Sequence, residues 1–378
     1  MNTIAAHDRN CQRTIWAAAC LVAGFCALPA ASASADAVED FYKGRQMTMI
    51  ISTGAGGGVD LMGRLIARHM VKHIPGQPHI VPKNMPGGGH MRATNFLYGQ
   101  APQDGSHLGA IIPSIVMHQM LGGEGAQYDA AKIQWLGSSS ASNSMLYVWH
   151  TKGVKSLDDA MKTEVIIGGT GAGAYTVLYP VLMNNLLGTR FKIVAGYKAS
   201  DDVDLAMEKG EVDGRAGATF NTLMSGNADW VRDKKIAILV QIGTERAGQF
   251  KDVPLLTDFA KTQEQREVLQ LFCDEIALGR PLLTTPNVPA DRVAALRKGF
   301  DATMTDATFL AEAEKSRLDV TPTSGARIQQ LVEGMIATKD AVVTRTKVAL
   351  DTKDAVNDKG KANSRLMSGK RRAKGEER

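Results

Sequence analysis

The clearest hydrophobic pattern of the chain runs from Met47 to Ile74. An uninterrupted apolar run, Met47 to Ile51, predicts a buried strand. Residues 52–58 are small and rich in glycine, and the residues after them place apolar side chains on one helical face and basic ones on the other. A strand, glycine loop and helix in this order direct backbone N–H groups at one point, where an anion can bind. The alternative is that the glycines only let the helix pack closely on its strand.

The same arrangement occurs a second time further along the chain. Val165 to Ile167 predicts a buried strand, residues 168–175 form another glycine-rich loop, and Thr176 to Leu187 predicts a helix. The second loop matches the G-x-G-x-x-A fingerprint of dinucleotide-binding folds, but no acidic residue follows at the expected distance. The first loop lacks the Gly-Lys-Ser/Thr ending of a phosphate-binding loop. We therefore expect no cofactor.

Apolar runs and amphipathic segments alternate along most of the chain. This alternation predicts an α/β protein whose sheets are mostly parallel. His79 to Pro82 predicts an edge strand, because proline cannot donate a backbone hydrogen bond. His107 to Ile112 predicts a strand, and Pro113-Ser114 a loop at its carboxyl end. Ile276 to Leu278 is interpreted as a further short strand.

The N-terminal segment has the pattern of an export signal. Two arginines, Arg9 and Arg13, precede the uncharged stretch Thr14 to Ala35, which ends in the cleavage-type sequence Ala33-Ser34-Ala35. The apolar stretch is nearly long enough for an uncleaved anchor, but the small-residue ending and Pro29 favour cleavage. Three of the four cysteines lie in this segment, so the mature chain retains only Cys273. We interpret Cys273 as a buried apolar residue rather than a nucleophile.

Charge is unevenly distributed along the chain. The whole sequence has 44 Lys and Arg against 39 Asp and Glu, but residues 36–350 contain as many acidic as basic residues. The excess lies in residues 351–378, a basic, glycine-containing tail with few large apolar residues, for which we predict disorder. Because residues 36–350 carry no net charge, the sequence does not indicate nucleic-acid binding.

Individual polar residues leave several interpretations open. His69 and His73 are spaced for one helix face, yet the glutamate of a zincin motif is missing, so solvated histidines are favoured over a metal site. No G-x-S-x-G motif or nucleophile with an evident base occurs, and we predict no catalytic residue. Arg215 either pairs with a surface carboxylate or clamps a substrate carboxylate in a cleft. Tyr197 is either a core aromatic or a hydrogen-bond donor in the cleft.

Six segments resemble motifs of one protein family in that family's order, and the resemblance covers about residues 44–345. The family is the receptor family of tripartite tricarboxylate transporters, also called Bug-family periplasmic solute-binding proteins. The segments are Thr53 to Asp60, Asn84 to Gly89, Ala101 to Gly105, Gly168 to Tyr175, Tyr197 to Ala199, and Asp252 to Pro254.

The resemblance implies the type II periplasmic-binding-protein fold, with two α/β lobes joined by two crossings and a ligand cleft between them. It implies that a monomer captures a small organic carboxylate in the periplasm and delivers it to the membrane permease of a tripartite transporter. We expect a signal peptide at 1–35, lobe 1 at 36–142 and 254–350, lobe 2 at 143–253, and the basic tail at 351–378.

The resemblance also implies how the ligand is held. Backbone amides of the first glycine loop hold one carboxylate, and the second loop with its helix N-terminus holds the other end. By this resemblance the ligand contacts are Thr53, Gly54, Ala55, Gly56, Gly57, Gly58, Ser114, Thr170, Gly171, Ala172, Gly173, Ala174 and Tyr175. Asn143, Tyr197, Arg215 and Thr219 are further expected ligand contacts.

The sequence departs from the family pattern in two places. Thr53 and Ala55 stand where proline and an aromatic residue are usual in the first loop. The Phe-Asp pair that meets the amine in amino-acid binders is not evident, and the corresponding segment is Gly214 to Phe220. We therefore do not expect an amino-acid ligand.

Three functions are compatible with these patterns. The first is a receptor without catalysis that hands an organic anion to a permease. The second is an exported α/β enzyme acting on a carboxylated substrate. The third is a ligand sensor for a signalling partner.

Overall fold

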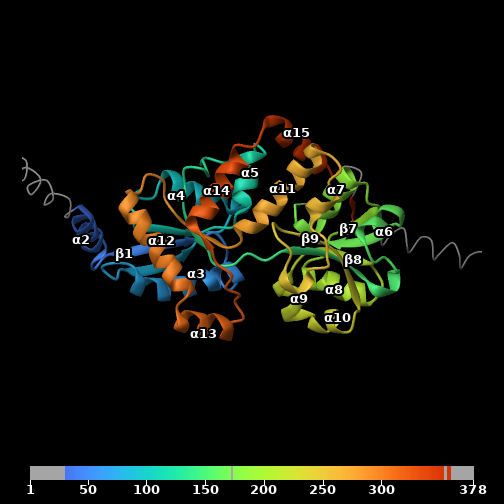
Figure 1. Ribbon diagram of the computed structural model, residues 1–378, viewed down its shortest axis with the longest axis horizontal. Coiled ribbons are helices and arrows are strands. Elements are labelled where there is room, and N and C mark those ends of the chain that lie inside the picture. Colours follow the sequence, from blue (N-terminus) through green and yellow to red (C-terminus); the bar gives the residue numbers. More distant parts are fainter. Residues whose placement is uncertain (1–29, 172, 353–355, 359–378) are drawn as a thin grey trace, which may run out of the picture.

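The computed structural model describes residues 30–171, 173–352 and 356–358. Over these residues the chain forms two α/β lobes, each built on a mixed sheet with helices on its faces (Figure 1). Lobe 1 is the part built on the sheet that contains β1, and lobe 2 is the part built on the sheet that contains β6. The predicted fold class, two α/β lobes, is confirmed.

The sheet of lobe 1 has the strand order β11-β4-β10-β3-β1-β2. Its centre is parallel: β1 pairs with β2 and β3, with Gln46 opposite His79 and Thr48 opposite His107. β10 runs antiparallel to both β3 and β4, and β11 runs antiparallel to β4. The strands are β1 (Gln46–Ile51), β2 (His79–Asn84), β3 (His107–Ala110), β4 (Gln134–Ser138), β10 (Pro281–Thr284) and β11 (Thr323–Ser324).

The sheet of lobe 2 has the strand order β12-β7-β6-β8-β5-β9. β6 pairs in parallel with β7 and β8, whereas β5 is antiparallel to both of its neighbours. The strands are β5 (Ser144–Trp149), β6 (Val165–Gly169), β7 (Phe191–Ala195), β8 (Gly214–Thr219), β9 (Ile236–Ile242) and β12 (Val356–Asp358).

Two of the antiparallel strands, β5 and β10, mark where the chain passes between the lobes. When the chain arrives directly from the other lobe, it reaches the sheet at the carboxyl ends of the parallel strands. The strand that begins there is therefore antiparallel to its neighbours. This applies to β5, which follows β4 of lobe 1, and to β10, which follows the helix α11 (Gln263–Leu278). The sheets are therefore mixed rather than mostly parallel.

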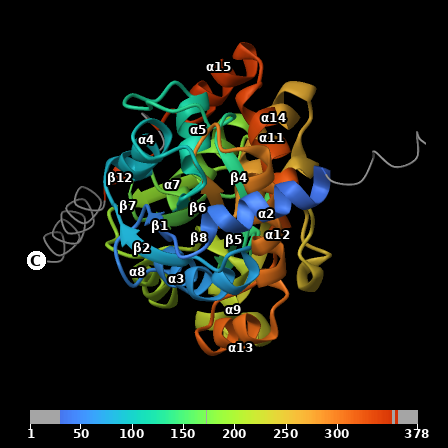
Figure 2. The same cartoon turned by 90° about the vertical axis from the view of Figure 1, so that its left-hand side faces the viewer.

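Helices cover both sheets and connect them. Figure 2 views the molecule with one lobe behind the other, with α13 and α9 at one edge and α15 at the opposite edge. Lobe 1 carries α2 (Ala30–Tyr42), α3 (Gly58–Met70), α4 (Met91–Gly99), α5 (Ser114–Met120), α12 (Ala290–Met304), α13 (Ala307–Lys315) and α14 (Gly325–Ile336), and lobe 2 carries α6 (Leu157–Lys162), α7 (Tyr175–Leu187), α8 (Ser200–Glu208), α9 (Phe220–Gly226) and α10 (Ala228–Arg232). Short 3-10 helices are η1 (Val71–His73), η2 (Gly88–His90), η3 (His150–Lys152), η4 (Gly248–Phe250) and η5 (Leu256–Phe259).

The last helix within the described residues, α15 (Asp340–Ala349), returns the chain toward lobe 2. It packs on α7 and α11, and the Asn185 side chain of α7 donates a hydrogen bond to the carbonyl oxygen of Ala349 at 3.0 Å. The chain thus passes between the lobes a third time, beyond the two crossings that the resemblance implies. The sequence positions of the lobe boundaries stay a prediction.

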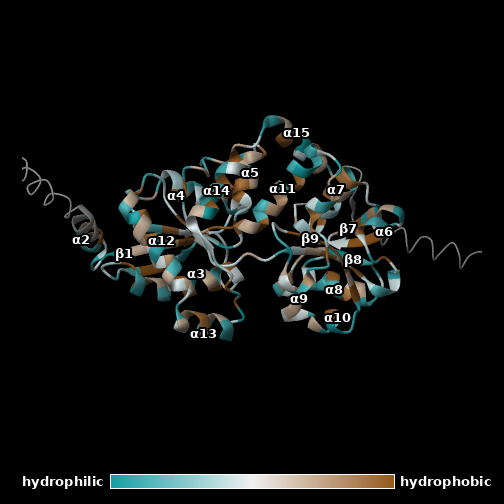
Figure 3. Cartoon of the chain, in the orientation of Figure 1, coloured by the Kyte–Doolittle hydropathy of each residue, from teal (hydrophilic) through white to brown (hydrophobic). Residues whose placement is uncertain are grey.

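The buried core follows the hydrophobic pattern of the sequence. Met47, Met49 and Ile51 of β1 are buried under the apolar face of α3, where Leu65 and Ile66 are also buried. Figure 3 shows hydrophobic residues concentrated along strands such as β1. Sixteen-residue α11 belongs to a core cluster that continues from one lobe into the other.

Three local predictions differ from the structure. Ile276 to Leu278 is the last turn of α11 rather than a strand, because the helical hydrogen bonds continue to Leu278. Ser114 begins the helix α5 rather than a loop. Within the predicted disordered tail, Val356–Asp358 pair in parallel with β7, while most of that tail lies outside the described residues.

The predicted export signal also lies largely outside the described residues. Its end, including the predicted cleavage sequence, belongs to the helix α2. Within the part of the chain that the structure describes, no helix combines the length and the apolar character needed to cross a bilayer.

Candidate functional site

A cavity of about 790 Å³ lies where the two lobes and the connecting segments meet. Lobe 1 contributes the start of α5 and the helix α13, and lobe 2 contributes the starts of α7 and α9. The connecting segments contribute three serines, Ser140, Ser142 and Ser144, and the end of α11. Every crossing segment that borders the cavity therefore presents polar atoms to it.

Arg280 is one of two arginines, with Arg317, that line the main cavity. It lies between the end of α11 and β10, is partly buried, and lines both the main cavity and a smaller one of about 220 Å³ at the start of α3. Its guanidinium makes no hydrogen bond to another described residue. Burial lowers the pKa of Arg280, and the charge of Asp319 opposes this shift. A partly buried guanidinium without a hydrogen-bond partner among the described residues favours an anion as its partner.

The first glycine loop leads into α3, whose N-terminus lies beside Arg280. A Cβ atom added to Gly58, the first residue of α3, would come within 3.2 Å of Nη2 of Arg280. The positive end of a thirteen-residue helix and a guanidinium thus converge on one place. This convergence supports an anion at the start of α3, although the loop itself does not line the main cavity.

An acidic residue of the chain already uses part of this loop. Oδ2 of Asp60 accepts a hydrogen bond from the Gly56 amide at 2.9 Å, and Oδ1 accepts from Arg64 and Asn84. Burial opposes ionisation of Asp60, but these hydrogen bonds together hold its pKa below the ordinary value. Asp60 therefore orders the loop and leaves fewer of its amides for a ligand.

The second glycine loop reaches the cavity through its last residue. Tyr175, the first residue of α7, lines the cavity, and the Thr170 amide instead donates to Thr176 Oγ1 at 3.0 Å. Gly217 of β8 lines the cavity beside it with φ +79°, and a Cβ there would lie 3.0 Å from the Thr176 nitrogen. Glycine at 217 therefore permits the start of α7 to pack against β8 at the cavity wall.

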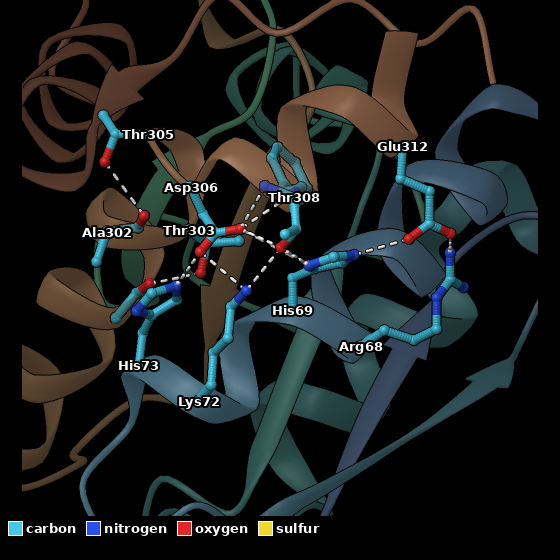
Figure 4. Close-up of polar contacts among 12 residues, drawn as sticks. Arg68, His69, Lys72, His73, Ala302, Thr303, Thr305, Asp306, Thr308 and Glu312 are labelled. Atoms are coloured by element: carbon cyan, nitrogen blue, oxygen red, sulfur yellow. Dashed lines mark hydrogen bonds and ion pairs between the residues drawn. The ribbon is translucent and has the colours of Figure 1, made fainter. Parts of the chain in front are cut away.

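The wall opposite α9 is formed by α13, which is held to α3 by charged side chains (Figure 4). His69 Nε2 lies 2.7 Å from Glu312 Oε2, Arg68 pairs with the same carboxylate, and Lys72 Nζ lies 2.8 Å from Asp306 Oδ2. Asp306 also caps α13 by accepting from two backbone amides. Two of the predicted histidine candidates, His69 and His73, thus face carboxylates, and among the described residues no group of side chains has the arrangement of a metal site.

The structure brings together only part of the predicted ligand contacts. Ser114, Tyr175 and Thr219 line the main cavity. Asn143 does not line it, because its amide donates to Gln241 Oε1 and to the Glu245 carbonyl oxygen. The predicted contacts that also do not line it are Thr53, Gly54, Ala55, Gly56, Gly57, Gly58, Thr170, Gly171, Gly173, Ala174, Tyr197 and Arg215, and Ala172 lies outside the described residues.

Arg215 is neither a surface residue nor a cavity residue. It is 3% exposed, and its Nη1 lies 2.5 Å from Oδ2 of Asp204, inside lobe 2. Tyr197 is buried in the core of the same lobe, which agrees with the packing interpretation. Cys273 is also buried, and burial raises the pKa of its thiol to about 12, so it remains the neutral apolar residue that the sequence predicts.

Sequence reasoning missed two charged residues at the cavity: Glu275 in the last turn of α11, and Arg280, which lies between α11 and β10. Glu275 is 3% exposed and follows Val268, Leu271 and Phe272 at helical spacing, so it occupies the apolar face of α11. A lone charge on an apolar helix face was the available signal. This signal has no meaning if the end of the helix is interpreted as a strand, as the sequence analysis does for Ile276 to Leu278.

Comparison with solved structures shows what this architecture is. A TctC solute binding protein from Polaromonas, solved without ligand, superposes with a TM-score of 0.64 at 15% identity, covering 80% of this chain and 99% of that one. The chain has the two-lobed type II periplasmic-binding-protein fold.

Two further structures with this fold hold organic acids. An R. palustris protein with adipate matches with a TM-score of 0.54 at 19% identity, over 81% of this chain and 97% of that one. MatC from Rhodopseudomonas palustris with bound malate matches with a TM-score of 0.52 at 18% identity, over 81% and 99%. No protein-family model and no curated protein matches the sequence.

Proposed function

We propose that this chain is a periplasmic solute-binding receptor that captures a small organic carboxylate between its lobes. The observation that carries the proposal is Arg280, a partly buried guanidinium in the interlobe cavity with no hydrogen-bond partner among the described residues. The N-terminus of α3 adds positive potential beside it. The fold supports the proposal, because structures with this fold hold adipate and malate.

In this proposal one carboxylate of the ligand meets Arg280 and the start of α3. Ser114 of α5 supplies a hydroxyl group to the cavity, and Thr219 and Tyr175 supply polar contacts from lobe 2. The serines of the connecting segments, Ser140, Ser142 and Ser144, supply further hydroxyl groups. The described residues of the glycine loops, 53–58, 170–171 and 173–174, approach the ligand when the lobes close, as the sequence resemblance implies. A ligand that bridges both lobes would stabilise the closed form.

The export signal predicted at residues 1–35 and the receptor-family resemblance support two further parts of the proposal. The chain acts in the periplasm as a monomer, and it delivers its ligand to the membrane permease of a tripartite tricarboxylate-type transporter. The described cavity offers ligand contacts on both lobes, and no arrangement of its residues specifically favours catalysis or signalling over transport.

A thermal-shift screen with matched acids and amides tests this function. The panel contains malate, succinate, adipate, citrate and benzoate, and each acid is compared with its amide. An acid present at a hundred times its Kd should stabilise the protein by about 2.7 kcal/mol. The proposal predicts that at least one acid raises Tm and that its amide does not. A flat response to every acid, or an equal response to the amides, would rule it out.

A further inference from the structure

Glu275 is a buried acid in the wall of the interlobe cavity. It is 3% exposed, and its Oε1 accepts a short hydrogen bond from the Tyr175 hydroxyl of lobe 2. Its side chain lies on the apolar face of α11 together with Phe272 and Val268. The second carboxyl oxygen, Oε2, has no hydrogen-bond partner in the described part of the chain, and the residue lines the cavity.

No cation compensates Glu275. Within the described residues no Lys, Arg or His nitrogen lies within 4.0 Å of its carboxylate. Burial raises the pKa of Glu275 to about 7, while the hydrogen bond from Tyr175 opposes the shift. Of the elements packed around it, α7 presents Tyr175 and Tyr179, and β9 carries no charged side chain. Arg327 of α14 acts on Asp274, Arg345 of α15 faces Glu264, Asp258 of η5 pairs with Arg246, and His118 of α5 contacts the Glu124 carbonyl oxygen. The other charged side chains that line the cavity are Arg280, Glu314, Arg317 and Asp319, and none of them forms an ion pair with Glu275.

An anionic ligand in the same cavity changes the balance at Glu275. Two negative charges that are close together and shielded from water repel strongly, so binding of a carboxylate disfavours the ionised form of Glu275. The neutral carboxyl instead carries an O–H group, which a carboxylate oxygen can accept. Arg280 also lines the cavity and forms no ion pair with Glu275, so both residues are available to one ligand.

We propose that Glu275 acts as a neutral acid in the ligand site, where it donates a hydrogen bond from its protonated carboxyl to a carboxylate of the bound ligand. The ligand class is an organic acid that binds as its full anion, and one solvent proton moves onto Glu275 as the complex forms. This inference rests on the proposed function, because it needs a carboxylate in the cavity.

The sign of the pH dependence distinguishes a neutral Glu275 that donates a hydrogen bond to the ligand from an ionised Glu275 that accepts one. Below about pH 7 Glu275 is already neutral, and binding needs no proton. Above that pH the residue must take up a proton, so affinity falls by up to about tenfold per pH unit. An ionised Glu275 that accepted a hydrogen bond from a ligand hydroxyl or ammonium group would give the opposite slope, with affinity rising with pH.

Titration calorimetry between about pH 7 and pH 9 measures this proton directly, because simple carboxylic acids are fully ionised there. Each acid of the panel that binds is titrated at pH 8 in phosphate and in Tris, whose different heats of ionisation report the number of protons taken up. We expect an uptake approaching one proton per bound acid, and none in Glu275→Gln, whose amide keeps a donor and the shape of the neutral acid. Glu275→Gln should therefore bind with an affinity that does not change with pH.

Asp274→Asn is the matched control. Asp274 is the adjacent residue of α11, burial also raises its pKa, and it does not line the cavity, so its variant should keep the proton uptake of the parent. Binding of an acid without proton uptake, or an affinity that rises with pH, overturns the role of Glu275 and leaves the proposed function intact. Failure of every acid to bind overturns both. If Glu275→Gln does not fold, the two-buffer measurement on the parent protein decides alone.

Discussion

Replacing Arg280 by methionine should separate ligand binding from stability. Methionine keeps a similar aliphatic length but removes the guanidinium that lies beside Gly58 and lines both cavities. A hydrogen bond to a charged group contributes about 1.5–3 kcal/mol. Loss of that contact should weaken binding of a panel acid by about ten- to a hundredfold.

The same change should not destabilise the free protein. In the structure the Arg280 side chain makes no hydrogen bond with a described residue, and burial already disfavours its charge, as the lowered pKa shows. Removing a partly buried charge without a partner removes a desolvation cost. The Tm of Arg280→Met without ligand should therefore equal or exceed that of the parent.

The affinity for the acid is measured by calorimetry, and the Tm without ligand is measured by thermal unfolding of the same preparation. Arg232→Met is the control, because Arg232 is exposed on α10, pairs with Asp233 and does not line the cavity. It removes the same charge and should leave acid binding unchanged. The reasoning is refuted if Arg280→Met binds the acid as tightly as the control does, or if it loses Tm without ligand.

Four other variants test separate parts of the structure. Asp204→Asn should lower the free energy of unfolding by about 3–5 kcal/mol in urea titrations, because it leaves Arg215 buried without its partner; a change below about 1 kcal/mol would contradict the buried pair. Gly57→Val and Gly171→Val should fold, since an added Cβ meets no atom within 4 Å, but each should weaken acid binding by about tenfold. If both variants bind the acid with the affinity of the parent protein, these glycines serve only the backbone conformation of their loops. Hydrogen bonds from Lys72 and from the start of α13 hold the pKa of Asp306 below its ordinary value, so the stability it adds is present above about pH 4 and is lost as the pH falls further. Asp306→Asn should accordingly lower Tm at pH 7 but much less in acid, and a constant loss of Tm at every pH would contradict this role.

Much of the fold could be predicted from local pattern. Apolar runs such as Met47 to Ile51 and Val165 to Ile167 became central parallel strands, because both faces of such a strand are buried. The direction of β5 and β10 could not be predicted, since it depends on which lobe the preceding segment comes from. The end of α11 was missed because a short apolar run reads equally as a strand or as a helix.

The site was harder to predict than the fold. The glycine loops can be recognised from their composition, but their distance from the cavity depends on how the lobes are arranged. Of the second loop, only Tyr175 lines the cavity. Arg215 was a reasonable candidate until the structure placed Asp204 beside it, a pairing between a strand and a helix that no local pattern shows. Arg280 belongs to no motif, and only the meeting of α11, β10 and α3 makes it a ligand candidate.

The most direct test of the central claim is a calorimetric titration of the mature chain with an acid and its matched diamide. Adipate and adipamide have the same carbon chain and differ in the charge that Arg280 would meet, as do succinate and succinamide. The account predicts one acid bound per chain with a measurable heat and no heat from its diamide. Equal binding of acid and diamide, or one-to-one binding of an acid that Arg280→Met leaves unchanged, would contradict it.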